Sequence, residues 1–75
     1  MRPIEHIRKH VFAVSQAVFG DIAGTTQASV SRWEQGTQEP SQSEMERIRG
    51  EAASRNLPWD DRWFFEVPTE EAGAA

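Results

Sequence analysis

The sequence predicts an all-α fold, a compact domain of four to five short helices. Three observations support this prediction. Apolar residues recur every three or four residues in several short segments, which is the spacing of one helical face. Pro, Ser or Thr opens these segments and Gly follows two of them, as at helix ends. With 75 residues and no Cys, the chain can form one small core and no disulfide.

The first helix is expected over residues 3–12. Pro3 suits a first helical turn, because its missing N–H has no partner there in any case. Ile4, Ile7 and Val11 follow at the spacing of one helical stripe, so we expect these three side chains to face the core.

The second helix is expected to begin after Ser15, which can cap it, and to run from Gln16 to a stop at Gly24. Phe19 and Ala23 lie on its core-facing side. Gly20 is small like Ala23, so a neighbouring helix can approach closely.

The third helix follows at once, capped by Thr25 or Thr26 and ended by Gly36. Its inward residues are Val30 and Trp33, and we expect Trp33 to be a core residue. Two short helices joined at a Gly are typical of a helix-turn-helix, here over residues 16–35.

The fourth helix is expected over residues 42–55. Ser41 and Glu44 have the spacing of a capping box, in which each side chain bonds the backbone N–H of the other. Met45, Ile48 and Ala52 then form an apolar stripe.

An aromatic segment over residues 58–67 ends the domain, which we expect to span residues 1–67. It is either a last short helix or a strand. Its rings can cover the core or form a dimer interface, and we expect a division between the two. Residues 68–75 are expected to form a disordered tail. The aromatic residues concerned are Trp59, Trp63, Phe64 and Phe65.

The charge is unevenly distributed along the chain. The net charge is −4, yet residues 1–36 hold four Lys or Arg against three acids, while residues 37–75 hold four Arg against nine acids. A phosphate senses charges only within about 8–10 Å, so the excess acid need not oppose DNA binding at residues 16–35.

The sequence contains no motif of a known enzyme class, and we expect neither an enzyme nor a bound cofactor. His6 and His10 lie four residues apart but lack a third ligand, so we expect no metal and a solvated or phosphate-facing role for both. No apolar run approaches the ~20 residues that span a bilayer, and no signal peptide is apparent. A cytoplasmic, nucleoid-associated protein is expected.

Residues 15–41, SQAVFGDIAGTTQASVSRWEQGTQEPS, resemble the Cro/C1-type (XRE-like) helix-turn-helix family of phage and bacterial repressors. Three positions differ from the family pattern. Ala13-Val14 replaces Gly-Leu, Thr25 replaces an apolar residue after the turn Gly, and the segment after the third helix has no cation.

The outward positions of the third helix are the candidate base-reading residues. With Val30 and Trp33 inward, they carry side chains suited to base edges, since Arg pairs with guanine, Gln with adenine, and the Ala methyl with a thymine methyl. The resemblance implies base contacts at these positions and phosphate or sugar contacts beside them. The base-contact residues are Gln27, Ala28, Ser31 and Arg32, and the phosphate-contact residues are Gln16, Thr26 and Ser29.

The resemblance also implies a structure and a function for the whole chain. Phe19, Ala23, Val30 and Trp33 would form the core of the helix-turn-helix, and Glu34 would pair with Arg8 or Lys9 as a surface pair of about 0–1 kcal/mol. The expected function is a small Cro-like repressor that binds double-stranded DNA as a homodimer at a near-palindromic operator. The alternative is a protein-binding helix-turn-helix module, or an antitoxin that acts through a protein partner.

Overall fold

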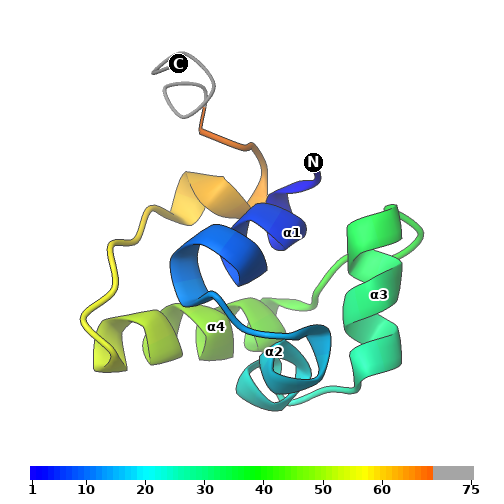
Figure 1. The fold of residues 1–75 in the computed structure, drawn as a ribbon, viewed down its shortest axis with the longest axis horizontal. Coiled ribbons are helices and arrows are strands. Elements are labelled where there is room, and N and C mark those ends of the chain that lie inside the picture. The colour runs from blue at the N-terminus through cyan, green and yellow to red at the C-terminus, as the bar shows by residue number, and fades with distance from the viewer. Residues whose placement is uncertain (69–75) are drawn as a thin grey trace.

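The computed structural model describes residues 1–68, and this part of the chain contains helices and no strand (Figure 1). The all-α prediction is therefore confirmed. Residues 69–75, in the predicted tail, lie outside the described residues. The elements in chain order are α1 (Pro3–His6), the π-helix η1 (Ile7–Phe12), α2 (Gln16–Ala23), α3 (Gln27–Gln35), α4 (Gln42–Ser54) and the 3-10 helix η2 (Asp61–Phe64).

The helices enclose one core. In Figure 1, α3 stands at one edge of the molecule, and α4 runs from that side toward the opposite side. The core contains the four residues predicted for it in the helix-turn-helix. The buried apolar residues are Ile4, Ile7, Phe12, Phe19, Ala23, Val30, Trp33, Ile48 and Ala52.

The first predicted helix changes its winding after His6. The N–H groups of Ala13 and Val14 both bond the Arg8 carbonyl, five and six residues back. A π-helix has more residues per turn than an α-helix, so a residue five positions after Ile7 returns to the same face. Phe12 is therefore buried, whereas Val11, predicted from the α-helical spacing, is only partly buried.

His6 corrects a second expectation for this helix. It is buried, and its ring meets the Trp63 ring edge-on with 5.5 Å between centroids. The sequence reading placed it in solvent or against a phosphate. This prediction for His6 was wrong because Trp63 of η2, which lies 57 residues further along the chain, covers that side of α1.

Both helices of the helix-turn-helix begin and end at the predicted residues. The Ser15 hydroxyl accepts from the Val18 N–H at 3.2 Å, and the Thr26 hydroxyl accepts from the Ser29 N–H at 3.1 Å, so Thr26 and not Thr25 caps α3. Gly24 and Gly36 end α2 and α3 with φ values of 78° and 83°, a conformation in which glycine has no Cβ clash.

The turn between α2 and α3 lies directly on α2. The Thr25 N–H donates to the Gly20 carbonyl at 2.8 Å, and a Cβ added to Gly20 would lie 3.0 Å from the Thr26 carbonyl carbon. The absence of a side chain at Gly20 thus allows the turn to lie close to α2. The sequence analysis predicted a close approach at this small residue.

Helix α4 has the predicted capping box, with both the Ser41 and Glu44 side chains bonded to the backbone of the other. Ile48 and Ala52 face the core, and Met45 is half-buried. The helix ends before Asn56, a residue type that tolerates its φ of 56°.

The aromatic segment forms a helix, η2, and not a strand. Trp59, Trp63 and Phe64 pack against the core and against one another, with centroids 5.2 and 5.9 Å from Trp59 to Phe64 and Trp63. Phe65 is 74% exposed. The expectation that some rings cover the core is confirmed, and the dimer contact stays a prediction.

Candidate nucleic-acid interface

The outer face of α3 carries the four predicted base-contact side chains. Gln27, Ala28 and Arg32 are exposed and Ser31 is half-buried, while Val30 and Trp33 on the opposite side are 0% and 5% exposed. Because Val30 and Trp33 are buried on one side of α3, the candidate base-contact residues lie on its opposite, solvent-facing side, since residues three or four apart share one side of a helix.

Arg32 is available to a ligand. Its side chain forms no ion pair with any residue among 1–68, although Glu34 and Gln35 are close in sequence. Ser31 differs, because its hydroxyl accepts a hydrogen bond from the Gln35 amide at 3.2 Å. That oxygen keeps its own proton, so Ser31 can still donate to a base or a phosphate.

Thr26 and Ser29 lie together at the start of α3. Besides capping the helix, the Thr26 hydroxyl donates to the Ser29 hydroxyl at 3.2 Å. The Thr26 proton is therefore already used, and the Ser29 proton is the one that remains for an outside acceptor.

Gln16, in the first turn of α2, belongs to a network that joins three segments. Its amide donates to Glu34 on α3 at 3.1 Å. Arg8 on η1 donates to both oxygens of the same carboxylate at 2.6 and 3.1 Å, and to the Val14 carbonyl at 3.0 Å. The second N–H and the oxygen of the Gln16 amide stay available for a phosphate.

The Arg8–Glu34 pair is not the surface pair expected from the sequence. Its side chains are only 12% and 10% exposed, and the hydrogen bonds that Arg8 donates to Glu34 raise the pKa of Arg8. Arg8 was one of the two predicted partners of Glu34, and the other, Lys9, pairs with Glu5. The burial of the Arg8–Glu34 pair depends on how η1, α2 and α3 converge, which spacing along the chain does not reveal.

Two cations that the sequence did not associate with the helix-turn-helix lie at the glycines that end its two helices. Arg47 of α4 packs against Gly24, where α2 ends, and Arg2 packs against Gly36, where α3 ends. Neither had a sequence signal, because each reaches the glycine across the tertiary fold.

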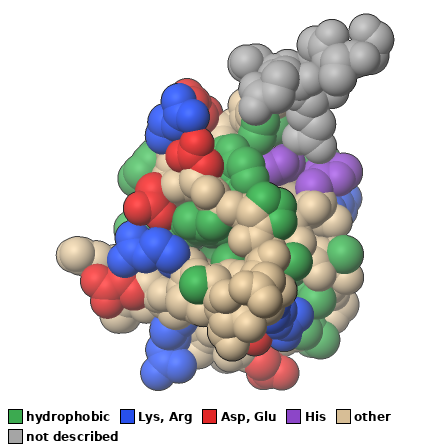
Figure 2. Space-filling view, turned by 90° about the vertical axis from the view of Figure 1, so that its left-hand side faces the viewer, with side chains coloured by type: hydrophobic (Ala, Val, Ile, Leu, Met, Phe, Trp, Pro, Cys, Tyr) green, Lys and Arg blue, Asp and Glu red, His purple; other side chains and the backbone are tan. Residues whose placement is uncertain are grey.

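Three of the four Arg residues of the second half are paired with acids. Arg49, Arg55 and Arg62 each pair with an acid, respectively Asp61, Glu51 and Asp60. On the side of the molecule turned away from α3, basic and acidic side chains alternate with apolar ones (Figure 2). The expectation that charge has to be judged face by face is consistent with this distribution.

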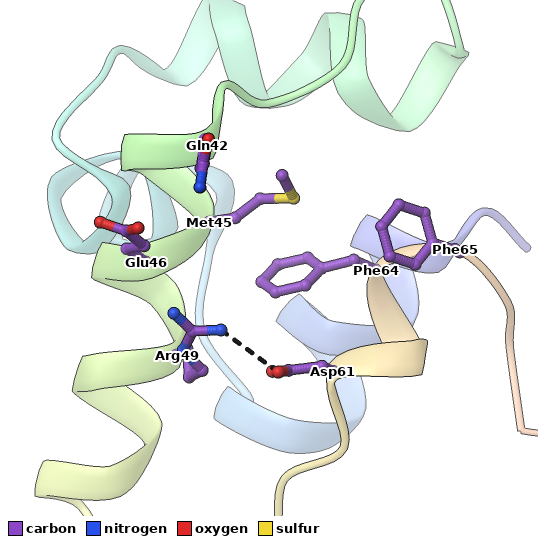
Figure 3. Close-up of a pocket in the computed structure, with 7 residues that line it drawn as sticks. All are labelled: Gln42, Met45, Glu46, Arg49, Asp61, Phe64 and Phe65. Carbon is purple, nitrogen blue, oxygen red and sulfur yellow. Dashed lines mark hydrogen bonds and ion pairs between the residues drawn. The ribbon is translucent and has the colours of Figure 1, made fainter.

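A pocket of about 290 Å³ lies between α4 and η2, where Phe64 and Phe65 project toward Met45 and the Arg49–Asp61 pair (Figure 3). A second pocket of about 260 Å³ lies between the start of α1, the segment after α3 and the same two Phe residues. Phe65 borders both pockets. No cluster of three metal-binding side chains occurs among residues 1–68, and none of the helices they form could cross a bilayer.

Two capped helices joined by a tight glycine turn, with a polar outer face on the second helix, define a helix-turn-helix of the kind that enters a DNA groove. Residues 13–49 match the family model described as helix-turn-helix, of the Cro/C1 or XRE type. The chain thus carries a DNA-binding domain of this regulator family, which is not a family of enzymes, and the resemblance is confirmed. Comparison with curated proteins and with solved structures gave no match.

Proposed function

We propose that the protein is a repressor that binds a near-palindromic operator as a homodimer, with α3 in the major groove. The observation that carries this proposal is the outer face of α3, where Arg32 has no ion pair within residues 1–68 and lies beside the exposed Gln27 and Ala28. Long side chains with free donors are what base edges require.

In this proposal Gln27, Ala28, Ser31 and Arg32 read base edges. Gln16 and Ser29 donate to the phosphates that border the groove, and Thr26, whose own proton already bonds Ser29, contacts the adjoining sugar. The Arg8–Glu34 pair supports the arrangement, because it holds the first turn of α2 at a constant distance from α3.

A homodimer is supported by the surface around Phe65. This ring projects beside a pocket of about 290 Å³ on the same face, so a two-fold axis could seat each ring in the partner's pocket. The pocket rim also holds Glu46 and the Arg49–Asp61 pair, so its border is polar around the apolar rings.

Selection of bound sites from random double-stranded DNA tests the function directly. We expect an enriched site with two related halves, and affinity for it that falls steeply as salt rises from 50 to 200 mM. No binding to any DNA at 50 mM salt would overturn the proposal.

The exposed Phe65 and its two pockets also favour a second candidate, a module that binds a protein, including an antitoxin. Selection from random DNA, carried out with the parent chain and with Phe65→Ala, separates the two. For a DNA-binding homodimer, loss of the ring lowers operator affinity together with self-association. For a protein-binding module, random DNA yields no enriched site with either chain.

A further inference from the structure

The guanidinium of Arg2 lies against Gly36, the residue that ends α3. A Cβ added to Gly36 would meet three guanidinium atoms at 2.5–2.8 Å, so the Arg2 side chain occupies the space that a larger residue would fill. Arg2 itself is exposed.

This position extends the outer row of α3. Ala28, Arg32 and Gly36 follow one another four residues apart along one side of the helix, and Arg2 covers the last of them. The segment after α3 supplies no cation of its own, since residues 37–44 include Glu39 and Glu44 and no Lys or Arg. The cation at this end of α3 therefore comes from the start of the chain, which lies toward that end of the helix in Figure 1.

A purely structural role for Arg2 would be to bond the carbonyls at the end of α3. Two of those carbonyls already have partners, and within residues 1–68 no bond from the Arg2 side chain reaches the others. The Arg32 carbonyl accepts from the N–H and the hydroxyl of Thr37 at 3.0 and 3.3 Å, and the Trp33 carbonyl accepts from the Gly36 N–H at 3.2 Å. Within residues 1–68 the Arg2 side chain donates no hydrogen bond and forms no ion pair, so its five N–H donors are available to a ligand.

We propose that Arg2 binds a DNA phosphate at the edge of the major groove where α3 leaves it. A planar guanidinium whose N–H donors have no other acceptor can bond two phosphate oxygens at once. This inference rests on the proposed function and adds a contact that residues 13–49 do not contain. Glu39 lines the pocket beside Arg2 and would repel the same phosphate.

The test compares Arg2→Gln with Arg55→Gln in the full chain, with any tag at the C-terminus. Both changes remove one positive charge, but Arg55 lies at the far end of α4 and pairs with Glu51. Dissociation constants for a selected site and for random DNA are measured from 50 to 200 mM salt. Thermal melting of each variant is measured in parallel.

The proposed homodimer carries two Arg2 side chains, so for Arg2→Gln we expect the slope of log K against log salt to fall by about 1.8, and the loss of affinity over this range to shrink about 12-fold. The change is expected on both DNAs, since a phosphate contact carries no sequence information. Glu39→Gln is expected to strengthen binding to both DNAs, and Arg55→Gln to leave the slope unchanged.

An unchanged slope for Arg2→Gln, with or without a lower melting temperature, would overturn the phosphate contact. An effect confined to the selected site would overturn it as well, because it would indicate base reading. Failure of the parent chain to bind any DNA is a different result, which would overturn the proposed function itself.

Discussion

Ala13 illustrates how one residue can carry strain in this fold. It ends η1 with φ of 57°, the left-handed region that costs a residue with a Cβ about 1–2 kcal/mol. The Cro/C1-type family pattern has Gly at this position. The left-handed φ of Ala13 explains that preference, because Gly adopts this conformation without a Cβ clash. The chain adopts the glycine conformation here although the residue is Ala.

Ala13→Gly should therefore raise the free energy of unfolding by about 1 kcal/mol, because the relief of the Cβ clash exceeds the added entropy of the unfolded chain. Urea denaturation measures the change. The matched control is Ala17→Gly on the exposed side of α2, which should lower stability by about 0.5–1 kcal/mol. Equal effects of the two changes would contradict the strain at Ala13.

Trp33→Ala should lower the free energy of unfolding by about 3–5 kcal/mol, because the ring is 5% exposed and its loss leaves a cavity between α3 and α1. Thermal or urea melting checks the change. A variant that melts like the parent would show that Trp33 does not support the core.

Arg32→Ala should leave the fold intact and cost about 1–3 kcal/mol of binding at the selected operator, because a bidentate base contact is lost. Binding is measured on the operator and on a site with one base pair changed. If the variant discriminated between these DNAs as well as the parent does, Arg32 would not read a base.

At the scale of elements, the helix-turn-helix is held from outside by η1. Arg8 reaches the Glu34 carboxylate of α3 and the carbonyl of Val14, which precedes α2. One side chain therefore sets the position of both helices. The π-helix matters here as well, because its wider winding carries Phe12 into the core against Phe19 of α2, with 5.6 Å between the ring centroids.

Arg8→Ala should cost about 3–5 kcal/mol of stability, since it leaves the Glu34 carboxylate largely buried without its cation. Urea denaturation of Arg8→Ala, Glu34→Gln and the double variant gives the coupling between the two side chains.

Lys9→Ala is the control for this cycle. Lys9 forms an exposed pair with Glu5 and lowers the pKa of that carboxyl through a hydrogen bond of 2.7 Å, but such a pair contributes only about 0.2–0.5 kcal/mol. That contribution is present above the usual range of a Glu pKa and is lost as the pH falls through the lowered value. Similar costs for Arg8→Ala and Lys9→Ala would contradict the role of burial.

At the scale of the whole molecule, the most exposed large apolar side chain among the described residues is Phe65. Three of the four aromatic residues near the C-terminal end of the described chain already pack against the core, so only Phe65 has most of its ring available to a partner. Phe65 borders the pocket between α4 and η2, which is lined by neither Arg2 nor any residue of α3, so a second copy seated in that pocket is compatible with the proposed DNA contacts.

Phe65→Ala should halve the mass seen by light scattering at concentrations where the parent is a dimer, with little change in monomer stability. Val18→Ala, another exposed apolar residue, serves as the control and should leave the mass unchanged. A parent chain that is monomeric at all accessible concentrations, or a Phe65→Ala variant that remains a dimer, would contradict this interface.

The sequence by itself determined the helices from α2 to α4 and the inward and outward sides of α3. Their signals are local, since Ser15, Thr26 and Ser41 cap from within one turn, and Gly24 and Gly36 stop helices through their own φ values. The tertiary structure decided what depends on contacts between distant segments. These include the winding of η1, the burial of His6 under Trp63, the burial of the Arg8–Glu34 pair and the position of Arg2 at the end of α3. Such contacts join residues far apart in the chain, and neither periodicity nor spacing records them.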